Sequence, residues 1–116
     1  MTADQFRKLV LNFPNSEERA HHGHPDFRVN GKIFATLGCP DDKRGMVPLT
    51  PEQQADLVHD HPEVFSPVPG GWGRGGSTRV HLPKATKAVL HPAVQAAFRN
   101  AIEKSRKRPS ATTLKN

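Results

Sequence analysis

The stretch FRVNGKIFATL, residues 27–37, decides the architecture of this chain because it has the pattern of a β-hairpin. Asn30-Gly31 stands between two strand-like runs, and a type I′ turn needs positive φ at both central positions, which Asn and Gly tolerate. A two-residue loop places Phe27 opposite Phe34. We therefore expect an antiparallel pair of strands with a cross-strand aromatic pair on one face.

Two further segments carry a helix N-terminal signal. Capping boxes of the form Thr-x-x-Gln begin at Thr2 and at Thr50. Each box can satisfy free N–H groups in the first turn of a helix. They predict helices over about residues 3–12 and 51–60.

The remaining predicted elements are short strands and a last helix. Strand-like runs lie at residues 16–24, 45–49 and 78–82, and a helix is predicted over about residues 92–105, since Pro92 suits a first helical turn. The order is helix, β-meander, helix, strand and helix. This order is typical of the α+β class, with an antiparallel sheet and helices packed on one face. The expected core contains Phe6, Val10, Phe27, Phe34, Leu37, Val58, Phe65, Val80 and Phe98.

The positive charge is concentrated at the C-terminal end. The chain has 116 residues, 17 basic side chains and a formal net charge of +6. Five of the basic residues lie in residues 104–116, which contain no acid. Residues 1–103 therefore hold 12 basic and 11 acidic residues and are nearly neutral.

This distribution predicts one domain followed by a tail. We expect residues 1–105 to form the folded domain and residues 106–116 to be a basic, disordered tail. Arg106, Lys107 and Arg108 in that tail can attract phosphates without sequence preference.

The composition argues against several classes of protein. No apolar run is long enough to span a membrane, and the N-terminal segment lacks the pattern of a signal peptide. Cys39 is the only cysteine, so no disulfide can form within the chain, and no motif supplies it with a catalytic base. We expect a cytoplasmic protein, monomeric, with no cofactor and no catalytic activity.

The segment SPVPGGWGRGGSTRV, residues 66–80, is the first candidate functional site. Its five glycines permit unusual backbone angles and close approach of other groups, but their spacing matches neither a P-loop nor a dinucleotide fingerprint. Trp72 has two interpretations. Its ring stacks on a base or wedges into a groove, or it folds back as a lid over the core. Arg74 and Arg79 are candidates for phosphate contacts.

The hairpin and a histidine cluster supply the other candidates. Arg28 and Lys32 lie on the hairpin, where they contact a nucleic-acid backbone or form an ordinary solvated surface. His22, His24 and Asp26 would share one face of an extended chain and could hold a divalent metal. No second ligand pair accompanies them, so we expect no metal site.

Four blocks of this sequence resemble the MmcQ/YjbR family of small bacterial proteins. They are FRKLVLNFP, HPDFRVNGKIFATL, LTPEQQADLV and HPEVFSPVPGGWGRGGSTRVHL, and the resemblance covers about residues 5–103. It implies a compact α+β domain related to the frataxin-type (CyaY-like) arrangement. The family is described as DNA-binding through a double-wing surface of hairpins and loops, so the resemblance implies double-stranded DNA as partner and carries over no catalytic residue.

Two functions remain as alternatives. A DNA-binding protein would contact the DNA backbone through the hairpin and the glycine-rich loop, and it needs a surface where Arg28, Lys32, Arg74 and Arg79 converge. A protein- or small-ligand-binding module, with no DNA affinity in its folded body, would have these charges dispersed and paired with acids.

Overall fold

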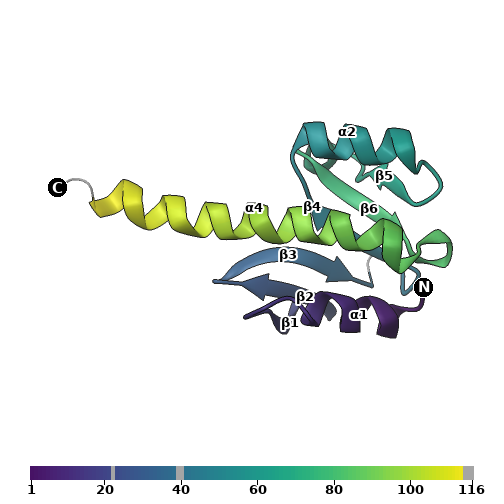
Figure 1. Cartoon of the computed structure of the whole chain (residues 1–116), viewed down its shortest axis with the longest axis horizontal. Helices are drawn as coiled ribbons and strands as arrows, with labels where there is room; N and C mark the ends of the chain where they lie inside the picture. Colours follow the sequence, from purple (N-terminus) through teal and green to yellow (C-terminus); the bar gives the residue numbers. More distant parts are fainter. Residues whose placement is uncertain (22, 39–40, 114–116) are drawn as a thin grey trace.

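A computed structural model describes residues 1–21, 23–38 and 41–113. In this part of the chain six antiparallel strands form one sheet in the order β1-β2-β3-β4-β6-β5 (Figure 1). The strands are β1 (Glu17–His21), β2 (His24–Val29), β3 (Lys32–Leu37), β4 (Arg44–Pro48), β5 (Phe65–Pro67) and β6 (Ser77–His81). The helices are α1 (Ala3–Leu11), α2 (Pro51–Asp60), α3 (Gly71–Arg74) and α4 (Lys87–Thr113), and a 3-10 turn spans Leu82–Lys84. The predicted α+β class with an antiparallel sheet is confirmed.

Three of the helices cover one face of the sheet. Figure 1 shows α1, α4 and α2 side by side across it, with α4 in the middle. Asn100 of α4 donates a hydrogen bond of 2.8 Å to Oε1 of Gln53, which joins α4 to α2. On the opposite face, which we call the open face, Met46 and Arg79 remain half-buried. No helix in the described residues is both long enough and apolar enough to cross a membrane.

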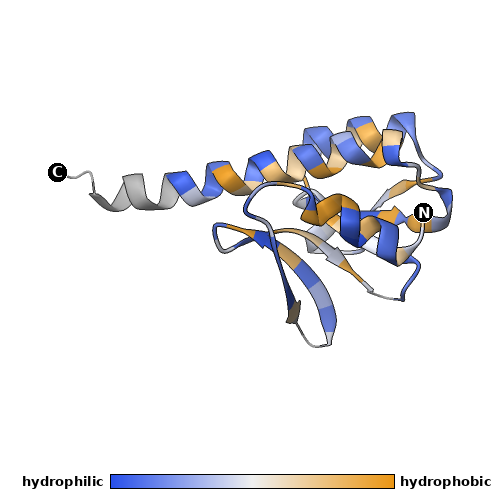
Figure 2. Ribbon diagram, turned by 60° about the horizontal axis from the view of Figure 1, so that its bottom comes forward, coloured by the Kyte–Doolittle hydropathy of each residue, from blue (hydrophilic) through white to orange (hydrophobic). Residues whose placement is uncertain are grey.

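The core lies between these helices and the sheet. Of the nine predicted core residues, eight are buried, and Val58 is partly buried and packs against them. Phe34 lies in an aromatic cluster, with its ring centroid 5.3 Å from that of Phe98 and 6.1 Å from that of Phe13. Figure 2 shows hydrophobic residues of α1 and α4 where these helices meet the sheet, and hydrophilic residues on α4 beyond it.

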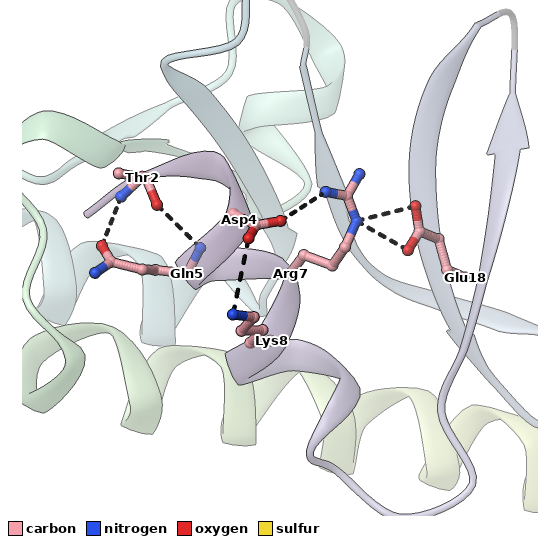
Figure 3. A network of polar contacts seen from close by, with 6 residues as sticks. All are labelled: Thr2, Asp4, Gln5, Arg7, Lys8 and Glu18. Atoms are coloured by element: carbon pink, nitrogen blue, oxygen red, sulfur yellow. Dashed lines mark hydrogen bonds and ion pairs between the residues drawn. The ribbon is translucent and has the colours of Figure 1, made fainter.

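Both predicted capping boxes form. At the start of α1 the backbone N–H of Gln5 donates to Oγ1 of Thr2 at 3.1 Å, and that of Thr2 donates to Oε1 of Gln5 at 2.8 Å (Figure 3). Arg7 then ties α1 to β1, because its Nε lies 3.0 Å from Oε1 of Glu18. The second box closes the first turn of α2 in the same way.

The hairpin tip forms as predicted. Asn30 and Gly31 have φ values of +52° and +78°, and Val29 pairs directly with Lys32. A two-residue turn of this kind matches the twist of the strands it joins.

The predicted pairing of Phe27 with Phe34 is wrong, because a β-bulge interrupts the hairpin. Phe27 pairs with Ala35 and Arg28 pairs with Ile33, so Phe34 is an extra residue on β3. A bulge leaves one residue unpaired and bends its strand. Phe34 and Ala35 are consecutive, yet both are buried.

α4 begins well before Pro92, where its start was predicted. Thr86 caps it, since its Oγ1 accepts a bond of 3.3 Å from the backbone N–H of Val89. Pro92 lies inside the helix, where it cannot donate to a carbonyl one turn back. Leu90 and Val94 on either side of it are fully buried, and their packing offsets that lost bond.

α4 also ends later than predicted. Residues 106–113 belong to the helix, although disorder was predicted from residue 106. Residues 106–108 are arginine and lysine, which have high helix propensity, and adding residues to a helix that is already formed avoids the unfavourable nucleation step. Residues 114–116 of the predicted tail lie outside the described residues.

Candidate nucleic-acid interface

The glycine-rich segment, which we expected to be a loop, is a fixed turn. β5 and α3 occupy part of it. Gln54 of α2 holds α3 in place, because its Nε2 donates to the carbonyl oxygens of Gly73 at 3.0 Å and Ser77 at 2.9 Å. Sequence reasoning missed Gln54, since its partners are backbone carbonyls of a distant segment and leave no motif.

Two glycines are required for the turn to close. A Cβ at Gly73 would overlap the carbonyl oxygen of Val68, and a Cβ at Gly76 would overlap that of Leu49. Gly76 also has a φ of +113° and accepts a hydrogen bond of 3.1 Å from the N–H of Leu49. The turn is therefore packed backbone against backbone, which only glycine allows.

Trp72 points into solvent on this turn. It is 79% exposed, while the neighbouring Gly73 is buried. The interpretation of Trp72 as a lid over the core is wrong, because the inward position of the turn is filled by glycine and backbone. Arg74 is also exposed and forms no ion pair with any described residue.

Arg79 lies on the open face of the sheet. It stands in β6 between Met46 of β4 and Ser66 of β5, its direct cross-strand partners. Its side chain is half-buried and has no carboxylate partner within the described part of the chain. Arg79 can therefore offer a free guanidinium to a ligand that covers the open face.

Arg28 is engaged within the protein. Its Nε and Nη2 donate to the two carboxylate oxygens of Asp26 at 2.9 and 3.2 Å. These bonds raise the pKa of Arg28 above its ordinary value. The Asp26 side chain is only 2% exposed, so it depends on Arg28 for its neutralisation.

Lys32 lies on the other side of the sheet from Arg28. It pairs with Val29, whose side chain is buried under the helices, and directly opposed residues share a face. Arg28 is paired with Ile33, which is exposed on the open face. The four cations of the hairpin and loop therefore do not converge on one surface.

The tip of the hairpin, α3 and the last part of α4 do lie at one end of the sheet. β3 and β6 both run antiparallel to β4, so both begin where β4 ends, and α3 directly precedes β6. Asn30 donates from its Nδ2 to Oγ of Ser105 at 3.3 Å, which places α4 beside the hairpin tip. We call this end, comprising residues 30–31, α3 and α4 from Lys104 onward, the wing end.

The basic residues of α4 extend from the wing end. Lys104 and Arg106 are exposed. The backbone of Lys107 and Arg108 continues the helix, and their side chains lie outside what the structure describes.

The histidine cluster does not assemble a metal site in the described residues. His24 is exposed at the start of β2, and the carboxylate of Asp26 forms an ion pair with Arg28. His22 and Cys39 lie outside the described residues. No group of three metal-binding side chains occurs among the rest of the described chain.

The fold and this wing end define a small α+β domain with a single sheet and one covered face. A family model described as YjbR matches residues 11–107, and the chain belongs to the YjbR family. The chain is similar to Deinococcus radiodurans protein DR2400, a crystal structure assigned to the domain family DUF419, with a TM-score of 0.68 and 19% identity over 84% of this chain and 75% of that one. No curated protein matches the chain. The likeness to DR2400 supports the fold alone.

Proposed function

We propose that this protein binds double-stranded DNA without enzymatic activity and contacts it through the wing end. The observation that carries the proposal is Trp72, held 79% exposed on a turn that hydrogen bonds fix to α2 and to Leu49, the residue after β4. Because the backbone that carries the ring is already ordered, binding costs little conformational entropy there. The large apolar area of the ring is therefore available to contact a partner.

The neighbouring charges suit a phosphate backbone. Arg74 is exposed on the same turn as Trp72, and α4 carries Lys104 and Arg106 at the same end of the sheet. Arginine and lysine contacts to phosphates position a protein on DNA but carry no sequence information. We therefore expect binding that depends strongly on salt and weakly on sequence.

The basic part of α4 should supply most of the affinity. If it neutralises about 3–5 phosphates, log affinity should fall with log salt at a slope of about −3 to −4.5 on duplex DNA. Replacing Lys104, Arg106, Lys107 and Arg108 with glutamine should flatten that slope. Fluorescence anisotropy with a labelled duplex measures it, and Lys43→Gln is the control, since Lys43 is exposed outside the wing end. An unchanged slope in the fourfold variant would place the binding surface on the body of the domain.

Trp72→Ala tests the turn itself. It should weaken DNA binding by at least about 1 kcal/mol, the scale for truncation of an aromatic side chain that becomes buried at an interface. Stability should stay within about 0.5 kcal/mol, because the ring is exposed. Arg74→Ala should cost about 1–2 kcal/mol of binding, the scale of one charged hydrogen bond. Leu11→Ala removes another exposed apolar side chain, on α1 and outside the wing end, and should leave DNA binding unchanged.

A specific observation also favours the alternative of a protein- or small-ligand-binding module. Arg28 is paired with Asp26, and Lys32 lies on the opposite face, as that alternative expects. If the fourfold variant of α4 has no affinity for DNA at low salt, with or without Trp72, then DNA binding does not belong to the folded body. The module would then be the better description.

A further inference from the structure

A groove of about 780 Å³ lies between α1 and the first turns of α4. Its lining includes Leu9, Phe13 and Ala85, which are buried apolar residues of the core. The ring of Phe13 stacks on the ring of His91, with 5.2 Å between the two ring centroids. The apolar surface of the floor therefore continues onto the side of the groove that α4 forms. The volume falls within the range of about 300–1,000 Å³ that is usual for sites of small ligands.

The rim of the groove is polar and lacks acids. Its polar lining residues are Gln5, Lys8, Asn12, Thr86, Lys87, His91 and Gln95. Lys8 forms an ion pair with Asp4, with 3.8 Å between Nζ and Oδ2 (Figure 3). Lys87 and His91 are exposed, and neither has a carboxylate partner among the described residues. They stand four positions apart on α4 and therefore on the same side of it.

We propose that the groove binds a small amphipathic carboxylate. Its apolar body would cover Leu9 and Phe13, and its carboxylate would lie between Lys87 and His91. A neutral apolar molecule would leave the cation of Lys87 without a partner. A free inorganic anion would leave the apolar floor uncovered. Only a ligand with both parts matches both features of the groove.

This site is independent of the proposed DNA contact. His91 and Ser105 lie on the same helix, and at 1.5 Å per residue the groove and the wing end are roughly 20 Å apart along α4. Substitutions at one place should therefore leave binding at the other unchanged. Each proposal can fail without the other.

The test is a titration of the ¹⁵N-labelled full chain with sodium hexanoate, followed by amide chemical shifts. We expect saturable shifts at Lys8, Asn12, Lys87 and His91. Hexanol has the same body without the charge, and inorganic phosphate has charge without the body. Each should bind at least about tenfold more weakly than hexanoate, because hexanol lacks about one charge-assisted hydrogen bond and phosphate lacks the burial of the apolar chain.

Variants locate the carboxylate. Lys87→Gln combined with His91→Gln should weaken hexanoate binding about tenfold, while duplex DNA affinity stays as it was. Lys84→Gln is the matched control, because Lys84 is exposed just before α4 but does not line the groove. The proposal is overturned if hexanol binds as tightly as hexanoate, if the double variant binds hexanoate unchanged, or if no saturable shift occurs at the groove.

Discussion

Alanine in place of Gly76 should destabilise the protein by about 3 kcal/mol or more. The residue has a φ of +113°, which side chains rarely permit, and a Cβ there would overlap the carbonyl oxygen of Leu49. Relief of that overlap would break the hydrogen bond of 3.1 Å from the N–H of Leu49 to Gly76. Urea denaturation followed by circular dichroism measures the change.

Gly71→Ala is the matched control in the same turn. A Cβ at Gly71 would lie 3.6 Å from Nη2 of Arg74, which is an ordinary contact. Alanine also favours a helix over glycine by about 1 kcal/mol, so the variant should be as stable as the wild type or slightly more so. Equal denaturation midpoints for Gly71→Ala and Gly76→Ala would show that the turn is loose and cannot hold Trp72 in a fixed position.

Phe34→Ala should cost about 3–5 kcal/mol of unfolding free energy. The side chain is 0% exposed and lies in the aromatic cluster with Phe13 and Phe98. Its removal leaves a cavity that the surrounding rings cannot fill without moving. A domain of this size is stable by about 5–15 kcal/mol, so the variant should melt at a much lower temperature.

Ile33→Ala is the control for Phe34→Ala, because it also removes a strand-favouring side chain from β3 but not one in the core. Ile33 precedes Phe34 on the same strand but is 36% exposed on the open face. Its truncation should cost about 1–2 kcal/mol, clearly less than at Phe34, because the side chain is only partly buried and its removal leaves no enclosed cavity. Similar losses for the two variants would contradict the placement of these two neighbours on opposite faces of the sheet.

Local hydrogen bonding explains which elements could be predicted. The capping boxes at Thr2 and Thr50 and the tip at Asn30-Gly31 are formed by groups within about four residues of each other. Because these hydrogen bonds join residues close together in sequence, the predicted bounds of α2, residues 51–60, agree with the observed helix. Thr86 is a residue type that often caps helices, and it does cap α4. The helix was nevertheless predicted to begin at Pro92, because proline is favoured in the first turn of a helix.

The candidate site was predicted as a set of residues but not as an arrangement. Trp72 and Arg74 were singled out because they stand among the glycines of residues 66–80, and both are exposed. The engagement of Arg28 by Asp26 follows from the period-two alternation of β2, yet only the structure showed the two side chains bonded. The groove beside α4 left no signal, because its lining comes from both ends of the chain.

The sequence by itself determined the α+β class, the core residues, the helix caps, the hairpin tip and the resemblance to the YjbR family. These features follow from hydrogen bonds between residues close together in sequence and from hydrophobic periodicity along short segments. Only the tertiary structure decided the bulge at Phe34, the exposure of Trp72 and the groove at Lys87 and His91. Each of these depends on how segments distant in the chain pack together. Gly76 shows the reason most clearly, since the backbone of Leu49, distant from it in sequence, fills the space that a side chain at this position would need.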